Sequence, residues 1–232
     1  MLMVNQLVGF GAFAEAGISS VTYLGQSTGD SVGSTSENVS IDLGTAHAGD
    51  KIVVVILHIN FSGANNLVST ITIGGNAASA AITPVQSSSE TASIYYFDDT
   101  SGVIGGSTTI AATFASAESL QMVAAYRLAN VVTGVATTQV TQNTTGTLNT
   151  LSLNAAANAI VIAGSQGRRT ADDSATWVGV TKNNETTGDL GDYQCSTGSA
   201  RASSTETPRA VTCTWSASQT RLVGVAATWN SL

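Results

Sequence analysis

The string GQSTG at residues 25–29 matches G-x-S-x-G, the nucleophile elbow of serine hydrolases, in which Ser27 would be the attacking nucleophile. That elbow needs a strand, a sharp turn and a helix, followed along the chain by the acid and then the histidine of the triad. The residues after Gly29 have no apolar i, i+3, i+4 pattern, so no packed helix is expected there. The only histidines, His47 and His58, come too early in the chain for that order. We therefore predict that Ser27 is a loop residue after a first strand and that the chain is not an enzyme.

The other residues that could do chemistry form no recognisable constellation. The acid pairs Asp98-Asp99 and Asp172-Asp173 lack the spacing of a calcium loop and are typical of turns. Cys195 and Cys213 have no CxxC or HxxxH partner, which argues against a metal site. They lie on neighbouring β-rich runs of the chain, so a disulfide and two free thiols both remain open. We predict no catalytic, cofactor or metal site.

Two further groups of residues have an assembly or binding interpretation. The Arg168-Arg169 doublet is expected at a solvated loop tip, where it could also meet an anionic partner. Residues 95–97 are three consecutive aromatics, so at least one should face outward and could stack on a sugar or a partner subunit. The three tryptophans fall at positions in β-rich runs that suggest core packing: Trp177, Trp215 and Trp229.

Composition narrows the class of protein. Only 10% of residues are charged, against about 25% in a typical domain, so the surface must be mainly Ser, Thr, Asn, Gln and Gly. Such a surface suits self-assembly, because few charges need to be desolvated on contact. The formal net charge of −7, with Lys51 and Lys182 as the only lysines, argues against nucleic-acid binding. No apolar run approaches the about 20 residues of a membrane span.

The elements that must position these residues are strands. Helical periodicity is nearly absent, and short β-rich runs recur between Gly, Asn, Asp and Ser, as in KIVVVILHI (51–59) and LVGVAATW (222–229). Pro84 and Pro208 are expected at the boundaries of such runs. The pattern predicts an all-β fold built as a sandwich.

An internal repeat predicts that the fold is duplicated. Residues 109–126 parallel 211–228, and 41–55 parallel 151–163 when two residues are dropped. The strings 70–75 and 176–181, and the strings 94–98 and 192–196, follow in the same order. We predict two related immunoglobulin-like or jelly-roll-like units, at 21–130 and 131–232. They could be separate domains or two halves of one larger sandwich.

An apolar arm, residues 1–20, precedes the first unit. It lacks the basic n-region of a secretory signal, so we read it as an uncleaved segment that docks on a larger assembly. Glu15 is the only charged side chain in residues 1–19. The residues expected to make the docking contacts are Leu2, Val4, Leu7, Val8, Phe10 and Phe13.

At VTYLG (21–25), AGDKIVVV (48–55), TITIGG (70–75) and VAAYRL (123–128) the chain resembles β-rich virion structural proteins of tailed bacteriophages. The resemblance covers about residues 20–229 and rests on strand and turn patterns. It implies a structural protein located in the virion, as a head decoration or spike or as a tail or fibre component. The implied partners are other copies in a homotrimer, other virion proteins contacted through the arm, and a host surface glycan. A carbohydrate-binding adhesion module is the alternative function.

Overall fold

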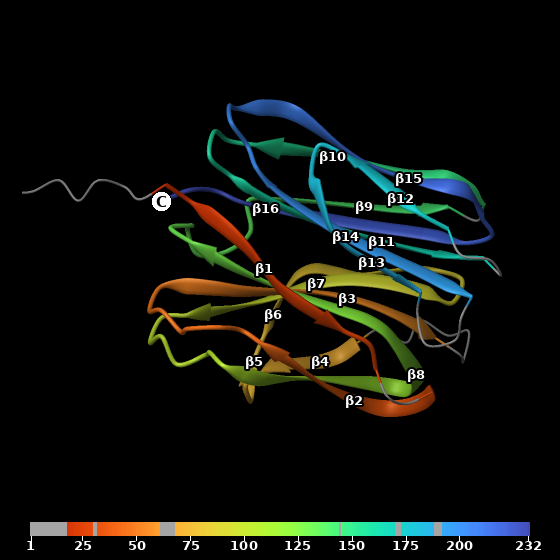
Figure 1. The fold of residues 1–232 in the computed structure, drawn as a ribbon, viewed down its shortest axis with the longest axis horizontal. Helices are drawn as coiled ribbons and strands as arrows, with labels where there is room; N and C mark the ends of the chain where they lie inside the picture. Colours follow the sequence, from red (N-terminus) through yellow and green to blue (C-terminus); the bar gives the residue numbers. More distant parts are fainter. Residues whose placement is uncertain (1–17, 30–31, 61–67, 144, 170–172, 188–191) are drawn as a thin grey trace, which may run out of the picture.

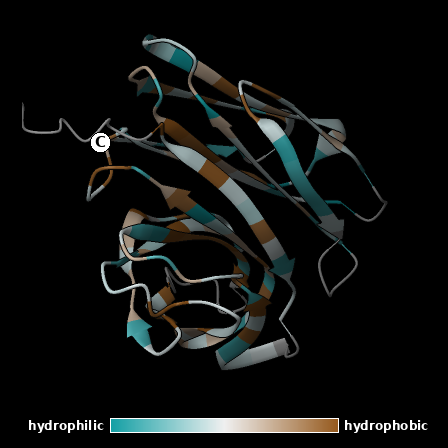
Figure 2. Ribbon diagram, turned by 60° about the vertical axis from the view of Figure 1, so that its left-hand side comes forward, coloured by the Kyte–Doolittle hydropathy of each residue, from teal (hydrophilic) through white to brown (hydrophobic). Residues whose placement is uncertain are grey.

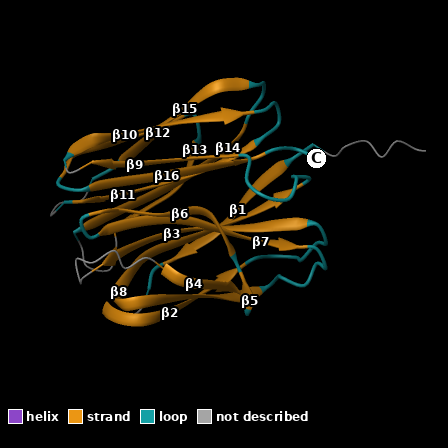
Figure 3. Cartoon of the chain, turned by 180° about the vertical axis from the view of Figure 1, so that it is seen from behind, coloured by secondary structure: helices purple, strands orange, loops and turns teal. Residues whose placement is uncertain are grey.

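The computed structural model describes residues 18–29, 32–60, 68–143, 145–169, 173–187 and 192–232. Every regular element among them is a β-strand, as Figure 3 shows, so the predicted all-β class is confirmed. A search of the described residues found no helix long and apolar enough to cross a membrane.

The first strand set lies in one eight-stranded sheet ordered β5-β4-β8-β3-β7-β6, with β1 and β2 also paired to β8 (Figure 1). The long last strand of this set, β8, pairs with four other strands. Its first half pairs with β2 and β4, and its second half pairs with β1 and β3. The strands are β1 (Ser20–Ser27), β2 (Val32–Asp42), β3 (Asp50–Asn60), β4 (Val68–Ile73), β5 (Asn76–Ala77), β6 (Ser79–Ser87), β7 (Glu90–Asp99) and β8 (Ser107–Ala129).

The second strand set forms two sheets, ordered β10-β15-β12 and β13-β14-β11-β16-β9. Its strands are β9 (Thr137–Asn143), β10 (Gly146–Ala155), β11 (Ile160–Arg168), β12 (Ala175–Val178), β13 (Thr181–Thr187), β14 (Tyr193–Arg201), β15 (Glu206–Gln219) and β16 (Leu222–Trp229).

The two sets share one pairing order. In the first set β8 lies between β2 and β4 and again between β1 and β3; in the second, β15 lies between β10 and β12, and β16 between β9 and β11. Val53 faces Tyr126 across β3 and β8, and Val161 faces Thr228 across β11 and β16. Segments 109–126 and 211–228 therefore occupy equivalent places in the two sets.

The two sets differ in the last part of each: one continuous strand in the first set and two strands in the second. In the first set β8 runs unbroken from Ser107 to Ala129, so all the strands join in one nearly closed sheet. In the second set the chain turns at Thr220 and Arg221, which separates β15 from β16 and leaves two sheets.

The first sheet folds over on itself into two layers, and the two sheets of the second set add two more (Figure 1). Three hydrophobic cores lie between these layers. Hydrophobic residues alternate with hydrophilic ones along many strands, as Figure 2 shows. β3 is apolar on both faces because it separates two cores: Ile52, Val54 and Ile56 point into the first set. Val53 and Val55 point the other way, into a core shared with β11 and β16 of the second set.

Close packing joins the two sets at that shared core. A Cβ placed on Gly164 of β11 would lie 2.6 Å from Val55 Cγ1 of β3, a distance that real atoms do not adopt. Tyr126 donates a 2.5 Å hydrogen bond to Thr197, and Asn184 donates a 3.0 Å bond to the Tyr23 hydroxyl. The sets are therefore in direct contact, through apolar side chains and hydrogen bonds.

The expected place of Pro84 and the register of one repeat string are wrong. Pro84 lies inside the edge strand β6 rather than at a boundary, at a register shift between Ile82 and Val85, and edge strands and bulges are where a sheet tolerates proline. The strings 94–98 and 192–196 fall on equivalent strands but not in register, because Tyr96 faces Val53 whereas Ala200 faces Val161. Short strings that share a few aromatic or polar letters do not fix a register.

Candidate functional site

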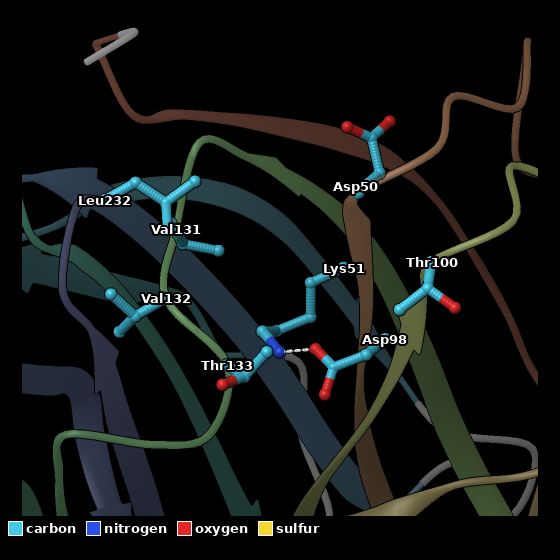
Figure 4. Close-up of a pocket in the computed structure, with 9 residues that line it drawn as sticks. Asp50, Lys51, Asp98, Thr100, Val131, Val132, Thr133 and Leu232 are labelled. Carbon is cyan, nitrogen blue, oxygen red and sulfur yellow. Dashed lines mark hydrogen bonds and ion pairs between the residues drawn. The ribbon is translucent and has the colours of Figure 1, made fainter. Parts of the chain in front are cut away.

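A pocket of about 330 Å³ opens at the end of the molecule where the chain terminates (Figure 4). The start of β3 and the end of β7 form one side of it. The connection between β8 and β9 and the C-terminal residue form the other. Its lining residues are Gly49, Asp50, Lys51, Asp98, Thr100, Val131, Val132, Thr133 and Leu232.

The charged groups of the pocket are already paired. The buried Lys51 ammonium donates to the Asp98 carboxylate and lies 4.5 Å from the centre of the Tyr96 ring. Burial lowers the pKa of Lys51 to about 8. Asp50 Oδ2 accepts a 2.8 Å bond from Arg127, which also donates to two backbone carbonyls. These pairings leave the pocket without excess charge, so it suits a neutral, apolar occupant better than an ion.

Both ends of the described chain are hydrogen-bonded to Asn130, the residue directly before the pocket-lining Val131. Asn130 donates its amide to the Ile18 carbonyl at 3.1 Å and accepts from the Leu232 backbone N–H at 3.0 Å. Ile18 is 67% exposed and Leu232 is 66% exposed. Asn130 itself has φ 55°, a left-handed conformation that Asn tolerates and that turns the chain out of β8 toward Val131.

Ser27 is not placed in a nucleophile elbow. It is the last residue of β1 and half-buried, and its hydroxyl donates to the Thr28 carbonyl at 3.2 Å. After the undescribed residues 30–31 the chain continues as β2, a strand and not a helix. The prediction of a loop residue is therefore off by one position. That the chain is not an enzyme stays a prediction.

The residues predicted to make the docking contacts lie outside the described residues: Leu2, Val4, Leu7, Val8, Phe10 and Phe13. The first described residue after them is Ile18, whose carbonyl accepts from Asn130.

The acid pairs and the arginine doublet make structural contacts. Asp99 accepts hydrogen bonds from the backbone of Val103 and Ile104, as expected for a turn aspartate. Asp173 accepts from Ala217 and Gln219 of β15, while Asp172 lies outside the described residues. Arg168 and Arg169 lie 3.9 Å and 3.8 Å from the carboxylates of Asp192 and Asp173. Within the described part of the chain, no three or more His, Cys, Asp or Glu side chains group to hold a metal.

Both cysteines are free thiols in different cores. Cys195 on β14 packs between the two sets, and Cys213 on β15 packs inside the second set. Their strands, β14 and β15, belong to separate sheets, so the two neighbouring runs do not pair as a hairpin and do not bring the thiols together. Burial raises the pKa of both thiols, that of Cys213 to about 12, which leaves them unreactive near neutral pH.

Aromatic rings are placed inside the molecule. Tyr95 is buried, and its neighbours Tyr96 and Phe97 are half-buried against the cores. The tryptophans are all buried, as predicted. Among the described residues no aromatic ring is exposed, so the expected outward ring of 95–97 is wrong and those residues offer no open stacking platform.

A buried acid–base pair lies at the far end of β3 from the pocket. His58 Nε2 is 3.8 Å from Glu118 Oε2, and neither side chain is exposed. The imidazole also packs on Phe114, with ring centres 5.1 Å apart. Burial raises the pKa of Glu118 to about 8.

A second buried carboxylate lies at the junction of the two sets. Glu90 begins β7 in the first set, and Arg221 of the second set lies 3.7 Å from it. Burial raises the pKa of Glu90, and the nearby Arg221 partly opposes that shift. This pair adds an electrostatic link to the apolar contact between the sets.

Sequence reasoning missed the pocket, although one signal was present. Lys51 is one of two lysines and stands directly before a long apolar run, where a charge must find a partner as the strand enters the core. Its partner Asp98 lies 47 residues away, and nothing in the sequence joins the two.

Comparisons of the chain with protein-family models, curated proteins and solved structures give no match.

Proposed function

We propose that this protein is a structural component of a tailed-phage virion, displayed on the particle surface as a head decoration or spike or as a tail or fibre protein. It acts through assembly. The observation that carries the proposal is that two exposed apolar residues, Ile18 and Leu232, are both hydrogen-bonded to Asn130, beside a pocket whose charges are already paired. Exposed apolar side chains gathered at one place favour a protein contact. The virion setting is supported by the resemblance at residues 21–25, 48–55, 70–75 and 123–128.

We also propose that the two strand sets are duplicated sandwich units. The shared pairing order and the matching registers at Val53 and Val161 support this. Immunoglobulin-like and jelly-roll-like units are the two proposed forms. In the first set β8 contributes to two layers, and in the second β15 and β16 do so. A rigid, duplicated β framework suits a protein whose task is to hold a fixed place in a particle.

Self-association follows from the same surface. Only 10% of the residues are charged, and several of those charges are paired within the chain, as in Lys51–Asp98 and Arg127–Asp50. Contacts between copies would then desolvate few free charges. A homotrimer is the proposed form, by analogy with the virion proteins that the sequence resembles.

Locating the protein on particles tests this function. Particles of the phage that encodes the chain are purified, and the chain is quantified in them by mass spectrometry and located by electron microscopy with a tagged copy. We expect a fixed copy number at regular surface positions. The full chain carrying Phe10→Glu and Phe13→Glu should fold but be lost from particles. A chain that is abundant in lysate yet missing from purified particles would overturn the virion assignment.

A further inference from the structure

We propose that the pocket at the end of β3 receives the N-terminal arm of a second copy of this chain. Residues 1–17 of the arm lie outside the described residues, which begin at Ile18, whose carbonyl accepts a hydrogen bond from Asn130. The residue after Asn130, Val131, lines the pocket, as does Leu232, whose N–H donates to the Asn130 carbonyl. The arm therefore joins the described chain close to this pocket. The inference rests on the proposed function, because it names the partner of that surface.

The chemistry of the pocket matches that of the arm. Lys51 pairs with Asp98 and Asp50 pairs with Arg127, so an incoming group finds no unpaired charge there. Val131, Val132 and Leu232 supply the apolar part of the lining. The volume of about 330 Å³ is at the lower end for ligand pockets, which suits one or two large side chains. The arm has only Glu15 as a charged side chain.

The sequence of the arm favours the pocket of a neighbour over the chain's own. The four residues before Ile18 are Ala14, Glu15, Ala16 and Gly17, and none has a large apolar side chain. The large side chains begin at Phe13 and continue back to Leu2. An extended chain covers about 3.3–3.6 Å per residue, so the four residues before Ile18 are long enough to let Phe13 reach past the chain's own pocket to that of a second copy.

This exchange makes the contact head-to-tail, because each copy gives an arm and accepts another. Contacts of this kind close into rings when the rotation between copies is a whole fraction of a turn. A ring of three copies satisfies the condition and agrees with the proposed homotrimer. Ile18 and Leu232, exposed in one copy, would then be covered in the assembly.

Variants of the full chain test the arm and the pocket separately. Phe10→Glu with Phe13→Glu places charges on the arm, and Leu232→Glu places one in the lining of the pocket, on a residue that is 66% exposed. Val178→Glu is the matched control, because Val178 is 62% exposed on the distant edge strand β12. Mass in solution is measured by light scattering at micromolar concentration, and folding is checked by circular dichroism. We expect multimers for the wild type and the control, and a single chain of 23.4 kDa for the other two.

Mixing experiments identify the occupant of the pocket. The arm variant keeps its pocket and the Leu232→Glu variant keeps its arm, so a mixture should give one-to-one dimers and nothing larger. Phe10→Cys in one copy and Leu232→Cys in another should form a disulfide between copies, while Phe10→Cys with Val178→Cys should not; the native cysteines are buried. A chain carrying both Phe10→Cys and Leu232→Cys that closes on itself would overturn the second copy as occupant.

The outcomes separate this inference from the proposed function. A wild-type mass of one chain, or multimers that survive Leu232→Glu, would overturn the arm exchange. If the arm variant is nevertheless lost from particles, the virion function stands and the arm binds a different virion protein. If the exchange is found but the protein is missing from particles, the virion function fails and the self-assembly remains.

Discussion

β3 carries an ionisable side chain at each end of its apolar stretch. Lys51 precedes its apolar stretch and is neutralised by Asp98, and His58 follows it beside Glu118. Each of these ionisable groups lies beside a partner from another strand, because burying such a group without a partner would be costly. Lys51 and Asp98 line the pocket, whereas His58 packs on the ring of Phe114.

Glu118→Gln tests how the second pair responds to pH. Burial raises the pKa of Glu118 to about 8 in the folded chain, against about 4.3 in an unfolded one. Between these values the folded state holds a proton that the unfolded state has released, so the free energy of unfolding falls as pH rises. The glutamine variant lacks this fall. We expect the free energy of unfolding of the variant to rise relative to that of the wild type by on the order of 3 kcal/mol between pH 5 and 8.

Urea unfolding at both pH values measures that difference. The wild type should lose stability from about pH 5 to about pH 8 at this site, and the variant should lose less. Parallel pH profiles for the two proteins would show that Glu118 is already ionised in the folded state at low pH.

At the scale of the elements, the contact between β11 and β3 depends on a missing side chain. Gly164 lies where a Cβ would come within 2.6 Å of Val55 Cγ1. Gly164→Ala should therefore overpack the shared core and cost about 1–3 kcal/mol of unfolding free energy. Val55→Ala makes room, so the double variant should be more stable than the sum of the two single losses predicts. Additive losses in chemical denaturation would mean that the two strands do not meet there.

The strands were largely predictable because their apolar pattern is local, and their partners were not. KIVVVILHI (51–59) and LVGVAATW (222–229) closely match β3 and β16, since runs buried on both faces are continuously apolar. The edge strand β6 escaped prediction because Pro84 and small residues interrupt its pattern. Residues 109–126 of the repeat lie within one strand, β8, whereas their counterparts at 211–228 are divided between β15 and β16. The pocket joins residues from four distant parts of the chain, which no local pattern shows.

For the whole molecule, the shared core decides whether the two sets unfold together. Among the described residues, nineteen buried ones from both sets form that core, including Leu57 and Met122 of the first set and Val225 and Trp229 of the second. The Glu90–Arg221 pair and the Tyr126–Thr197 hydrogen bond cross the same junction. We therefore expect one cooperative transition, in which damage to either set lowers the stability of both.

Ile56→Ala tests this coupling, because Ile56 is fully buried in the core that belongs to the first set alone. The substitution should cost about 2–5 kcal/mol through the cavity it leaves. All three tryptophans lie in the second set, so their fluorescence reports on that set, while far-ultraviolet circular dichroism reports on both. In urea, the fluorescence midpoint should fall together with the dichroism midpoint. An unchanged fluorescence midpoint would mean that the second set folds independently and that the shared core contributes little to its stability.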